Sequence, residues 1–233
     1  MSKPVCAVVG VGEGNGAALA RAFANEGAAV ALLARRTDFT SKLAKELPDA
    51  RAYACDAADS ASIAEAFGLI RAEMGDPTTL IYNAGSGVWG DVESVGLRDF
   101  EAAWRVNAYG AFAASREVIP AMKAAGRGVI IFIGATASRR GAPGTAAFAP
   151  AKAAQRSLAE SMAKSLWPHG IHVALIVIDA VVDLPRTRER MPNEPDDFFL
   201  KPVDMAASAV WLAKQPRSAW SFEIEVRPFR EKW

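Results

Sequence analysis

The stretch VCAVVGVGEGNGAA, residues 5–18, decides the fold. Its first five residues are apolar and lead into Gly10, a pattern typical of a buried parallel strand that ends in a tight turn. Three more glycines follow, Gly12, Gly14 and Gly16, and helix-forming residues begin directly after them. Such a strand, turn and helix start can point peptide N–H groups at a phosphate. Glycine is needed there because a Cβ would block the turn or the ligand.

Taken alone, this stretch fits three kinds of structure. A dinucleotide-binding loop, the nucleotide loop of a methyltransferase and a plain turn between a strand and a helix all have glycines in this position. The remainder of the chain has to distinguish between them.

Apolar runs of strand length alternate with helical patterns along the whole chain. The strand candidates are residues 5–9, 29–33, 50–54, 79–82, 128–133, 172–178 and 222–226, and the helix candidates are residues 16–25, 39–47, 60–74, 97–125, 146–166 and 203–214. Crossovers of helix length make neighbouring strands parallel. The order therefore predicts an α/β protein, a single Rossmann-type doubly wound parallel sheet of about seven strands with helices on both faces. No repeat or linker divides residues 1–233, so we expect one domain.

The longest stretch without a regular pattern is residues 179–202, which contains four prolines and many charges. A loop of this length inside a compact domain is usually functional or mobile. We expect a substrate lid here, with a disordered surface loop as the alternative.

Charge, hydropathy and cysteine content exclude several classes of protein. The 27 basic and 26 acidic side chains leave a net charge of +1, which argues against nucleic acid or an anionic membrane as a partner. No apolar run is long enough to span a bilayer, and Val5 begins the first strand with no room for a signal peptide, so we expect a cytoplasmic location. Cys6 and Cys55 are far apart in apolar runs, which predicts buried thiols and no metal site.

The second expected strand ends in Ala34-Arg35-Arg36. A dinucleotide site usually has an acidic residue about 20 residues after the glycines, and it binds the ribose 2′-hydroxyl. A guanidinium binds a 2′-phosphate instead, so NADP(H) is favoured and NAD(H) is the alternative, because Glu13 adds negative charge to the glycine turn. Arg35 and Arg36 also fit solvated charges at a helix start. The missing acid counts against a methyltransferase, which needs a carboxylate for its ribose.

Four short motifs lie in order along the chain. They are Gly10-x-x-x-Gly14-x-Gly16, Cys55-Asp56, Tyr82-Asn83-Ala84-Gly85 and Val106-Asn107-Ala108-Tyr109-Gly110. They resemble the TGxxxGxG turn, the adenine-binding Asp, the NNAG motif and the VNxxG segment of the short-chain dehydrogenase/reductase family, with Val9 in place of the first Thr. The resemblance extends from residue 5 to about residue 183 and disfavours the plain turn.

The resemblance implies a role for each motif. Asp56 would hold the adenine amino group, and Asn107 would belong to the catalytic tetrad. The other cofactor-binding residues would be those of the glycine turn and of the NNAG-like motif: Gly10, Gly12, Glu13, Gly14, Asn15, Gly16, Asn83, Ala84 and Gly85.

The catalytic segment departs from the family's pattern. The family has YxxxK at the start of a long helix, whereas this chain has Phe148-Ala-Pro-Ala-Lys152. Lys152 is kept and would bind the nicotinamide ribose, but the phenol that donates a proton is absent. The serine that steadies the substrate oxygen is replaced by Ala135, and Thr136 and Ser138 lie beside it. The lost acid is worth about 10²–10⁴-fold in rate and the lost oxyanion donor about 10²–10³-fold.

The nicotinamide end also departs from the pattern. In place of the family's PGxxxT the chain has Asp179-Ala-Val181-Val-Asp-Leu, so Asp179 and Val181 are expected to contact the nicotinamide. Of the three tyrosines, Tyr53 and Tyr82 belong to strands, and only Tyr109 is expected near the site, where packing is the favoured role.

Two functions fit this mixture of kept and lost residues. The first is an NAD(P)-dependent oxidoreductase acting on a small carbonyl or alcohol substrate, in which Thr136, Ser138, Asn107 or a water held by Lys152 replaces the missing acid. The second is an NADP(H)-binding protein with little or no catalysis, such as a sensor or scaffold. The helical patterns at residues 97–125 and 146–166 resemble the pair through which the family assembles, so we expect a homodimer or homotetramer.

Overall fold

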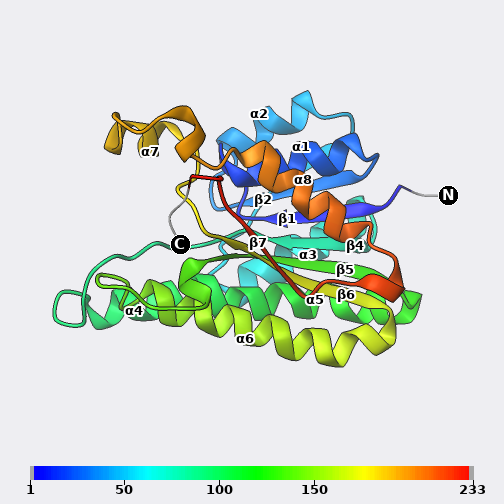
Figure 1. Ribbon diagram of the computed structural model, residues 1–233. Helices are drawn as coiled ribbons and strands as arrows, with labels where there is room; N and C mark the ends of the chain where they lie inside the picture. The colour runs from blue at the N-terminus through cyan, green and yellow to red at the C-terminus, as the bar shows by residue number, and fades with distance from the viewer. Residues whose placement is uncertain (1–2, 231–233) are drawn as a thin grey trace.

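The computed structural model describes residues 3–230, and over them the chain forms a seven-stranded parallel sheet with the strand order β3-β2-β1-β4-β5-β6-β7 (Figure 1). The strands are β1 (Val5–Val9), β2 (Ala29–Ala34), β3 (Ala50–Ala54), β4 (Pro77–Tyr82), β5 (Gly128–Ala135), β6 (Ile171–Ile178) and β7 (Glu223–Val226). The order reverses between β1 and β4, and a crevice at the carboxyl ends of the strands is where such sheets bind ligands. The predicted doubly wound α/β fold is confirmed.

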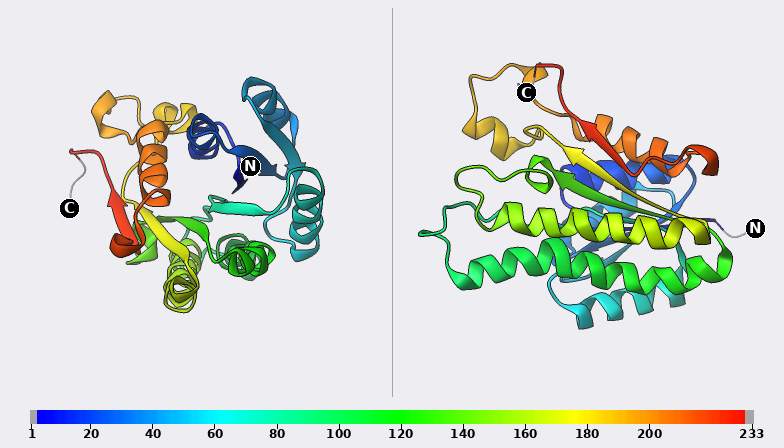
Figure 2. Two further views of the ribbon diagram at one scale, coloured as in Figure 1. Left: turned by 90° about the vertical axis from the view of Figure 1, so that its right-hand side faces the viewer. Right: turned by 60° about the horizontal axis from the view of Figure 1, so that its bottom comes forward.

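Helices cover both faces of the sheet (Figure 2). One face is covered by α1 (Asn15–Asn25), α2 (Asp38–Glu46) and α8 (Pro202–Ala213), and the other by α3 (Ser60–Glu73), α4 (Leu97–Trp104), α5 (Gly110–Ala125) and α6 (Phe148–Leu166). No helix in the described part of the chain is long and apolar enough to cross a membrane.

The central strands are buried on both sides, which explains their continuous apolar runs, whereas the edge strands β3 and β7 are partly exposed. Along β1, Ala7 and Val9 face the layer of α3, α5 and α6, whereas Cys6 and Val8 face the layer of α1 and α8. Parallel strands under two helical layers lose the usual alternation of polar and apolar residues. Cys6 and Cys55 are buried free thiols, as predicted.

The helix expected over residues 97–125 is interrupted. Between α4 and α5 lies a π-helical turn, η1 (Arg105–Tyr109), which contains Asn107. Turns of this kind often occur at functional sites because they re-aim one side chain within an otherwise regular helix. Helical propensity does not distinguish the two hydrogen-bonding patterns, so the sequence did not predict this turn.

The expectation of a wholly irregular segment at residues 179–202 is wrong, because a short helix, α7 (Pro185–Arg190), lies within it. Pro185 begins the helix, where its missing N–H has no helical partner to lose. Thr187 Oγ1 accepts a hydrogen bond from the Leu184 N–H at 2.9 Å and holds the first turn. Six residues are too few to produce a helical period in the sequence.

Candidate active site

The glycine turn after β1 is held between the ends of β2 and β4. Gly10 has φ +90°, and a Cβ on it would lie 2.4 Å from the backbone of Ala84. Its N–H donates to Leu33 O at 2.9 Å, and Asn83 Nδ2 donates to Gly10 O at 2.7 Å. Only glycine fits both this backbone conformation and the close approach of β4. Asn83 and Ala84 therefore shape the turn.

The rest of the turn leaves an open cradle at the start of α1. A Cβ on Gly12 would meet no described atom within 4 Å, whereas one on Gly16 would lie 2.6 Å from Gly10 O. Asn15 Oδ1 is buried and has no hydrogen-bond partner within residues 3–230. Open space and helix-start N–H groups are what a cradle for a phosphate needs, and an unpaired amide oxygen beside them can accept a hydrogen bond from a ligand hydroxyl.

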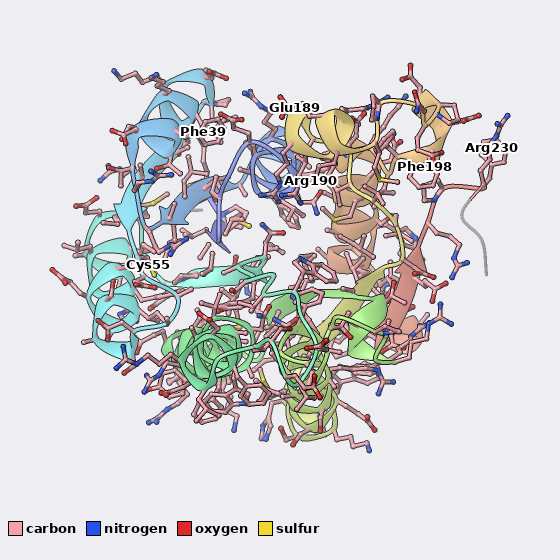
Figure 3. All side chains as sticks on the ribbon, turned by 90° about the vertical axis from the view of Figure 1, so that its left-hand side faces the viewer. Phe39, Cys55, Glu189, Arg190, Phe198 and Arg230 are labelled. Carbon is pink, nitrogen blue, oxygen red and sulfur yellow. The ribbon has the colours of Figure 1, made fainter. Side chains whose placement is uncertain are left out.

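The segment that contains α7 reaches back over this turn. A Cβ on Gly14 would lie 2.4 Å from Leu184 Cδ2, so the Leu184 side chain packs directly on the glycine. Viewed onto the carboxyl ends of the strands, α7 with Glu189 and Arg190 lies beside the start of α1 (Figure 3). Arg188 binds Asp183 and Asp196, the first at 2.7 Å, and fastens α7 to its own flanking segments. The glycine turn is thus covered on one side and open at Gly12.

The residues expected at the adenine end lie at the ends of the neighbouring strands β2 and β3. Arg35 and Arg36 are exposed, and no ion pair to either is found in the described part of the chain. Asp56 is exposed and accepts a hydrogen bond from the Ala58 N–H at 2.9 Å through Oδ1. Glu13 is exposed on the glycine turn. Arg35, Arg36 and Glu13 are therefore accessible to a ligand, whereas one oxygen of Asp56 is bonded within its own turn.

Two buried polar side chains converge where the chain passes Gly85. Asn107 Nδ2 donates to Ala103 O at 2.8 Å and to Ser86 O at 3.1 Å, which leaves its Oδ1 buried and unpaired among the described residues. A Cβ on Gly85 would lie 3.4 Å from Asn107 Oδ1 and 3.7 Å from Lys152 Nζ. The structure therefore brings together the predicted Gly85, Asn107 and Lys152 around one small space.

Lys152 is buried, and no ion pair to it is found within residues 3–230. Its side chain lies in the first turns of α6, the residue is 4% exposed, and Nζ donates to Ile133 O at 2.8 Å. Burial lowers the pKa of Lys152 to about 8, because the charged ammonium is poorly solvated there. A lysine with this pKa can give up or take a proton near neutral pH.

Phe148 occupies the first position of α6, one helical turn before Lys152. Its ring packs on that of Trp89, with 5.2 Å between the centroids, and Trp89 is 65% exposed. Pro150 fits in the first turn of this helix because the N–H groups there have no helical partner. The two rings form an apolar pair, and neither carries an acidic proton.

The hydroxyls near the serine position are bonded within the protein. Thr136 Oγ1 donates to the Asp179 carboxylate, which also accepts a hydrogen bond from Arg227. Ser138 is buried, and its Oγ accepts the Ala135 N–H at 3.1 Å. Asp179 thus anchors the end of β5 to the end of β7.

Val181 and the tyrosines also have structural partners. Val181 O accepts the Leu200 N–H at 2.9 Å, which joins the two ends of the segment containing α7. The Tyr53 hydroxyl donates to Glu73 Oε2 at 2.9 Å, and the Tyr82 hydroxyl donates to Val106 O at 2.5 Å. Tyr109 packs on Trp104 and Arg105, which are exposed. Each tyrosine ring is therefore engaged in packing or in a structural hydrogen bond.

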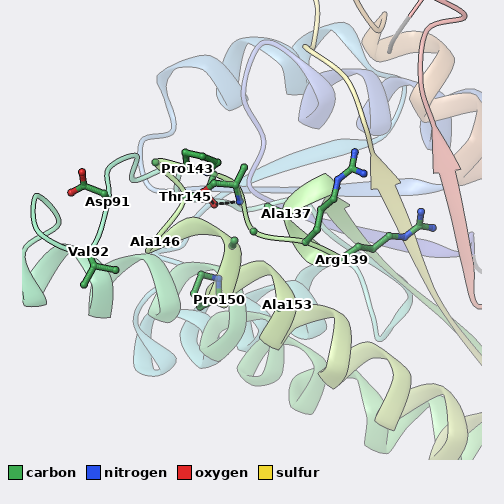
Figure 4. A pocket seen from close by; sticks show the side chains of 14 residues that line it. Asp91, Val92, Ala137, Arg139, Pro143, Thr145, Ala146, Pro150 and Ala153 are labelled. Carbon is green, nitrogen blue, oxygen red and sulfur yellow. Dashed lines mark hydrogen bonds between the residues drawn. The ribbon is translucent and has the colours of Figure 1, made fainter. Parts of the chain in front are cut away.

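A cavity of about 620 Å³ adjoins the start of α6 (Figure 4). Three residues of α6 line it, Ala149, Pro150 and Ala153, but Phe148 and Lys152 do not. Its other walls come from the loop after β5 and from the loop before α4: Asp91, Val92, Ala137, Arg139, Arg140, Gly141, Ala142, Pro143, Gly144, Thr145 and Ala146.

Sequence reasoning missed Gln155. This residue is fully buried, and its Oε1 accepts a hydrogen bond from Lys152 Nζ at 3.1 Å. Its Nε2 donates to Asn107 O at 2.9 Å. The available signal was its position three residues after Lys152 on an alanine-rich helix, which puts both side chains on one face.

The family model described as short chain dehydrogenase matches residues 4–193, a span that contains the glycine turn, Asn107 and Lys152. The chain belongs to the short-chain dehydrogenase family. This agrees with the predicted resemblance, and the family supplies oxidoreductases that use this fold.

Solved structures of other short-chain dehydrogenases share the whole fold. One from Rhodopseudomonas palustris is 33% identical, with a TM-score of 0.84, and the match covers 97% of this chain and 99% of that one. A metagenomic short-chain oxidoreductase in complex with NADP is 30% identical, with a TM-score of 0.85 and 97% of each chain covered. A curated relative from Xanthobacter autotrophicus, inactive 2-(S)-hydroxypropyl-CoM dehydrogenase 2, is 30% identical over 83% of this chain and 90% of its own.

Proposed function

We propose that this short-chain dehydrogenase is an NADP(H)-dependent oxidoreductase that interconverts a small carbonyl compound and its alcohol. It would do so with Phe148 and Ala135 where the family has its tyrosine and serine. The observation that carries the proposal is the convergence of Lys152 Nζ and Asn107 Oδ1 at Gly85, on the carboxyl side of the sheet that also contains the glycine turn.

The residues present fit a dinucleotide. The open space at Gly12 and the orphaned Asn15 Oδ1 suit a diphosphate with its sugars, and the unpaired Arg35 and Arg36 suit a 2′-phosphate. Asp56, Asn83 and Ala84 would hold the adenosine, and Gly85 and Lys152 would border the nicotinamide ribose. Asp179 and Val181 would flank the nicotinamide. The NADP held by the metagenomic neighbour supports the choice of NADP(H) over NAD(H).

The proton would come from Lys152. A bound nicotinamide supplies or accepts the hydride, so this chain has to supply or accept the accompanying proton at the substrate oxygen. The Thr136 hydroxyl already donates its hydrogen bond to Asp179, and the Phe148 side chain has no acidic proton. Lys152 has a pKa of about 8 and faces the space at Gly85, where a water held by Asn107 Oδ1 would pass the proton on.

The segment of residues 179–202 would act as the substrate lid of this one dinucleotide-binding domain, residues 1–233. Leu184 already packs on the glycine turn, so a movement of α7 would open the cofactor site and the substrate site together. The apolar pair of Phe148 and Trp89 at the start of α6 would favour a substrate with an apolar group beside its carbonyl carbon.

Steady-state assays with NADPH or NADP⁺ over a broad panel of ketones, aldehydes and alcohols test the proposal. Turnover above background, lost in Lys152→Met, supports it. The double variant Phe148→Tyr with Ala135→Ser restores the family's acid and oxyanion donor, and should raise turnover by about 10²-fold or more. If neither the unmodified protein nor the double variant turns over any compound of the panel, the oxidoreductase proposal fails.

A second function is favoured by the same two replacements. An NADP(H)-binding sensor or scaffold needs the glycine turn but no acid, and one relative carries the word inactive in its name. For this function, calorimetry would show NADP(H) binding, while neither the unmodified protein nor the double variant Phe148→Tyr with Ala135→Ser would turn over any compound of the panel.

We also propose that the protein assembles as a homodimer or homotetramer through α4, α5 and α6, with a small molecule as its substrate and neither nucleic acid nor a membrane as a partner. Large apolar side chains are exposed on two of these helices: Leu97, Phe100, Trp104 and Phe112. Light scattering that gives the mass of a monomer would exclude this assembly.

A further inference from the structure

Within residues 3–230, Gln155 is the only side chain that hydrogen-bonds both Lys152 and the turn that carries Asn107. Its amide is fully buried, with Oε1 3.1 Å from Lys152 Nζ and Nε2 2.9 Å from Asn107 O. Both partners fix which way the amide points. A flipped amide would set its NH₂ group against the ammonium and its oxygen against a carbonyl, which leaves both contacts unbonded.

This bridge determines which atoms of the site remain available. An ammonium has three N–H donors, and two of them on Lys152 go to Ile133 O and Gln155 Oε1. The third is left for the space at Gly85, 3.7 Å from Nζ to the position of a Cβ. Gln155 Nε2 donates to the carbonyl of Asn107, and the only Asn107 atom within 4 Å of the Cβ position on Gly85 is Oδ1.

Gln155 is also neutral, which matters for a buried cation. The groups found in contact with Lys152 within residues 3–230 are uncharged: Ile133 O from β5, Asn107 from η1, Gly85 after β4 and Gln155 from α6 itself. Burial alone therefore acts on the pKa of Lys152 and lowers it to about 8. A carboxylate in the place of this amide would stabilise the ammonium and hold its proton more tightly.

We propose that Gln155 is a positioning residue that acts through Lys152: its amide fixes the ammonium in one orientation and adds no negative charge beside it. The Lys152 proton then stays transferable at neutral pH and is directed at the space beside Gly85. This inference rests on the role of Lys152 in the proposed function.

The test measures the titration of Lys152 in the full chain without cofactor or substrate. Protein labelled with ¹³C-lysine gives one NMR signal per lysine Cε, and Lys152→Arg assigns the signal of interest. The variants are Gln155→Glu and Gln155→Leu. The matched control is Gln215→Glu, which makes the same charge change after α8, where Gln215 bonds Ser221.

We expect Gln155→Glu to raise the pKa of Lys152 by about 1–3 units, because an opposite charge lies within hydrogen-bonding distance. Gln155→Leu should lower it, because the ammonium loses an acceptor in a buried place. Gln215→Glu should leave it unchanged. Circular dichroism and melting curves check that each variant is folded, and Gln155→Met replaces the leucine variant if that one does not fold.

Two results overturn the inference. One is a folded Gln155→Glu variant with the Lys152 titration of the control. The other is a rise in the pKa of Lys152 in Gln155→Leu or Gln155→Met, which would mean that Gln155 merely keeps water out. Neither measurement needs turnover, so a silent substrate panel would refute the proposed function while these titrations still decide the role of Gln155.

Discussion

Gly85→Ala tests the site because it fills the space between Lys152 and Asn107 without straining the chain. The new methyl group would lie 3.4 Å from Asn107 Oδ1 and 3.7 Å from Lys152 Nζ, which are close but not clashing contacts. Gly85 is exposed and has no positive φ. The free energy of unfolding should therefore change by no more than about 0.5 kcal/mol, as for other surface substitutions.

The effect on catalysis should be much larger. The methyl group would displace a water that joins Lys152 to the substrate, and misplacement of this size at a reacting centre costs about 10²-fold in rate. We expect kcat/KM to fall by that factor, about 2.7 kcal/mol in the activation free energy. The affinity for NADP⁺ should change less than tenfold, because most of the proposed contacts lie at the glycine turn.

The assays are steady-state kinetics on the substrate that the panel identifies, calorimetry with NADP⁺, and chemical denaturation. Gly68→Ala is the control, since it adds the same methyl group in α3, where a Cβ would meet no described atom within 4 Å. That variant should keep full activity and gain up to about 1 kcal/mol from helix propensity. Full activity in Gly85→Ala would refute the account of the Lys152 and Asn107 pair.

Three further predictions follow from other parts of the structure. Between about pH 8 and 10.5 Lys152 is protonated in the unfolded chain but not in the folded one, because burial lowers its pKa. Raising the pH through this window should therefore increase the free energy of unfolding of the protein, relative to that of Lys152→Met, by up to about 3 kcal/mol in urea titrations. A difference in free energy of unfolding that stays constant with pH would contradict this. The double variant Arg35→Ala with Arg36→Ala should weaken NADP⁺ binding about 10-fold to 100-fold and leave NAD⁺ binding nearly unchanged, as measured by calorimetry. Equal losses of affinity for both cofactors would argue against a 2′-phosphate site. Leu184→Ala removes the side chain packed on Gly14 and should speed limited proteolysis at α7 with little change in melting temperature, whereas an unchanged cleavage rate would show that this contact does not hold the segment.

Most of the sheet could be predicted because its central strands are buried on both faces and have continuous apolar sequences. The bounds of β1 and β3 agree with their apolar runs. β5 continues two residues past its expected end at residue 133, because Gly134 and Ala135 pair with the extended β6. That extension depends on a partner strand far away in the sequence, so the local pattern does not contain it.

The candidate site also contains residues that local motifs predict and contacts that depend on the folded arrangement of distant elements. Motif spacing places Asn107 and Lys152 at one end of the sheet, and the structure shows them around Gly85. The contacts between Gln155 and Asn107, and between Asp179 and Arg227, join residues of different elements. Such contacts arise only once the strands are ordered side by side, so no local pattern could have indicated them.

The central claim is that the open turn at Gly12 holds a dinucleotide diphosphate whose nicotinamide end reaches Lys152. The most direct measurement is a crystal structure of the protein grown with excess NADP⁺. The account predicts diphosphate density against the N–H groups of the turn and a ribose hydroxyl within hydrogen-bonding distance of Lys152 Nζ. An empty turn, or a nucleotide bound elsewhere on the protein, would contradict it.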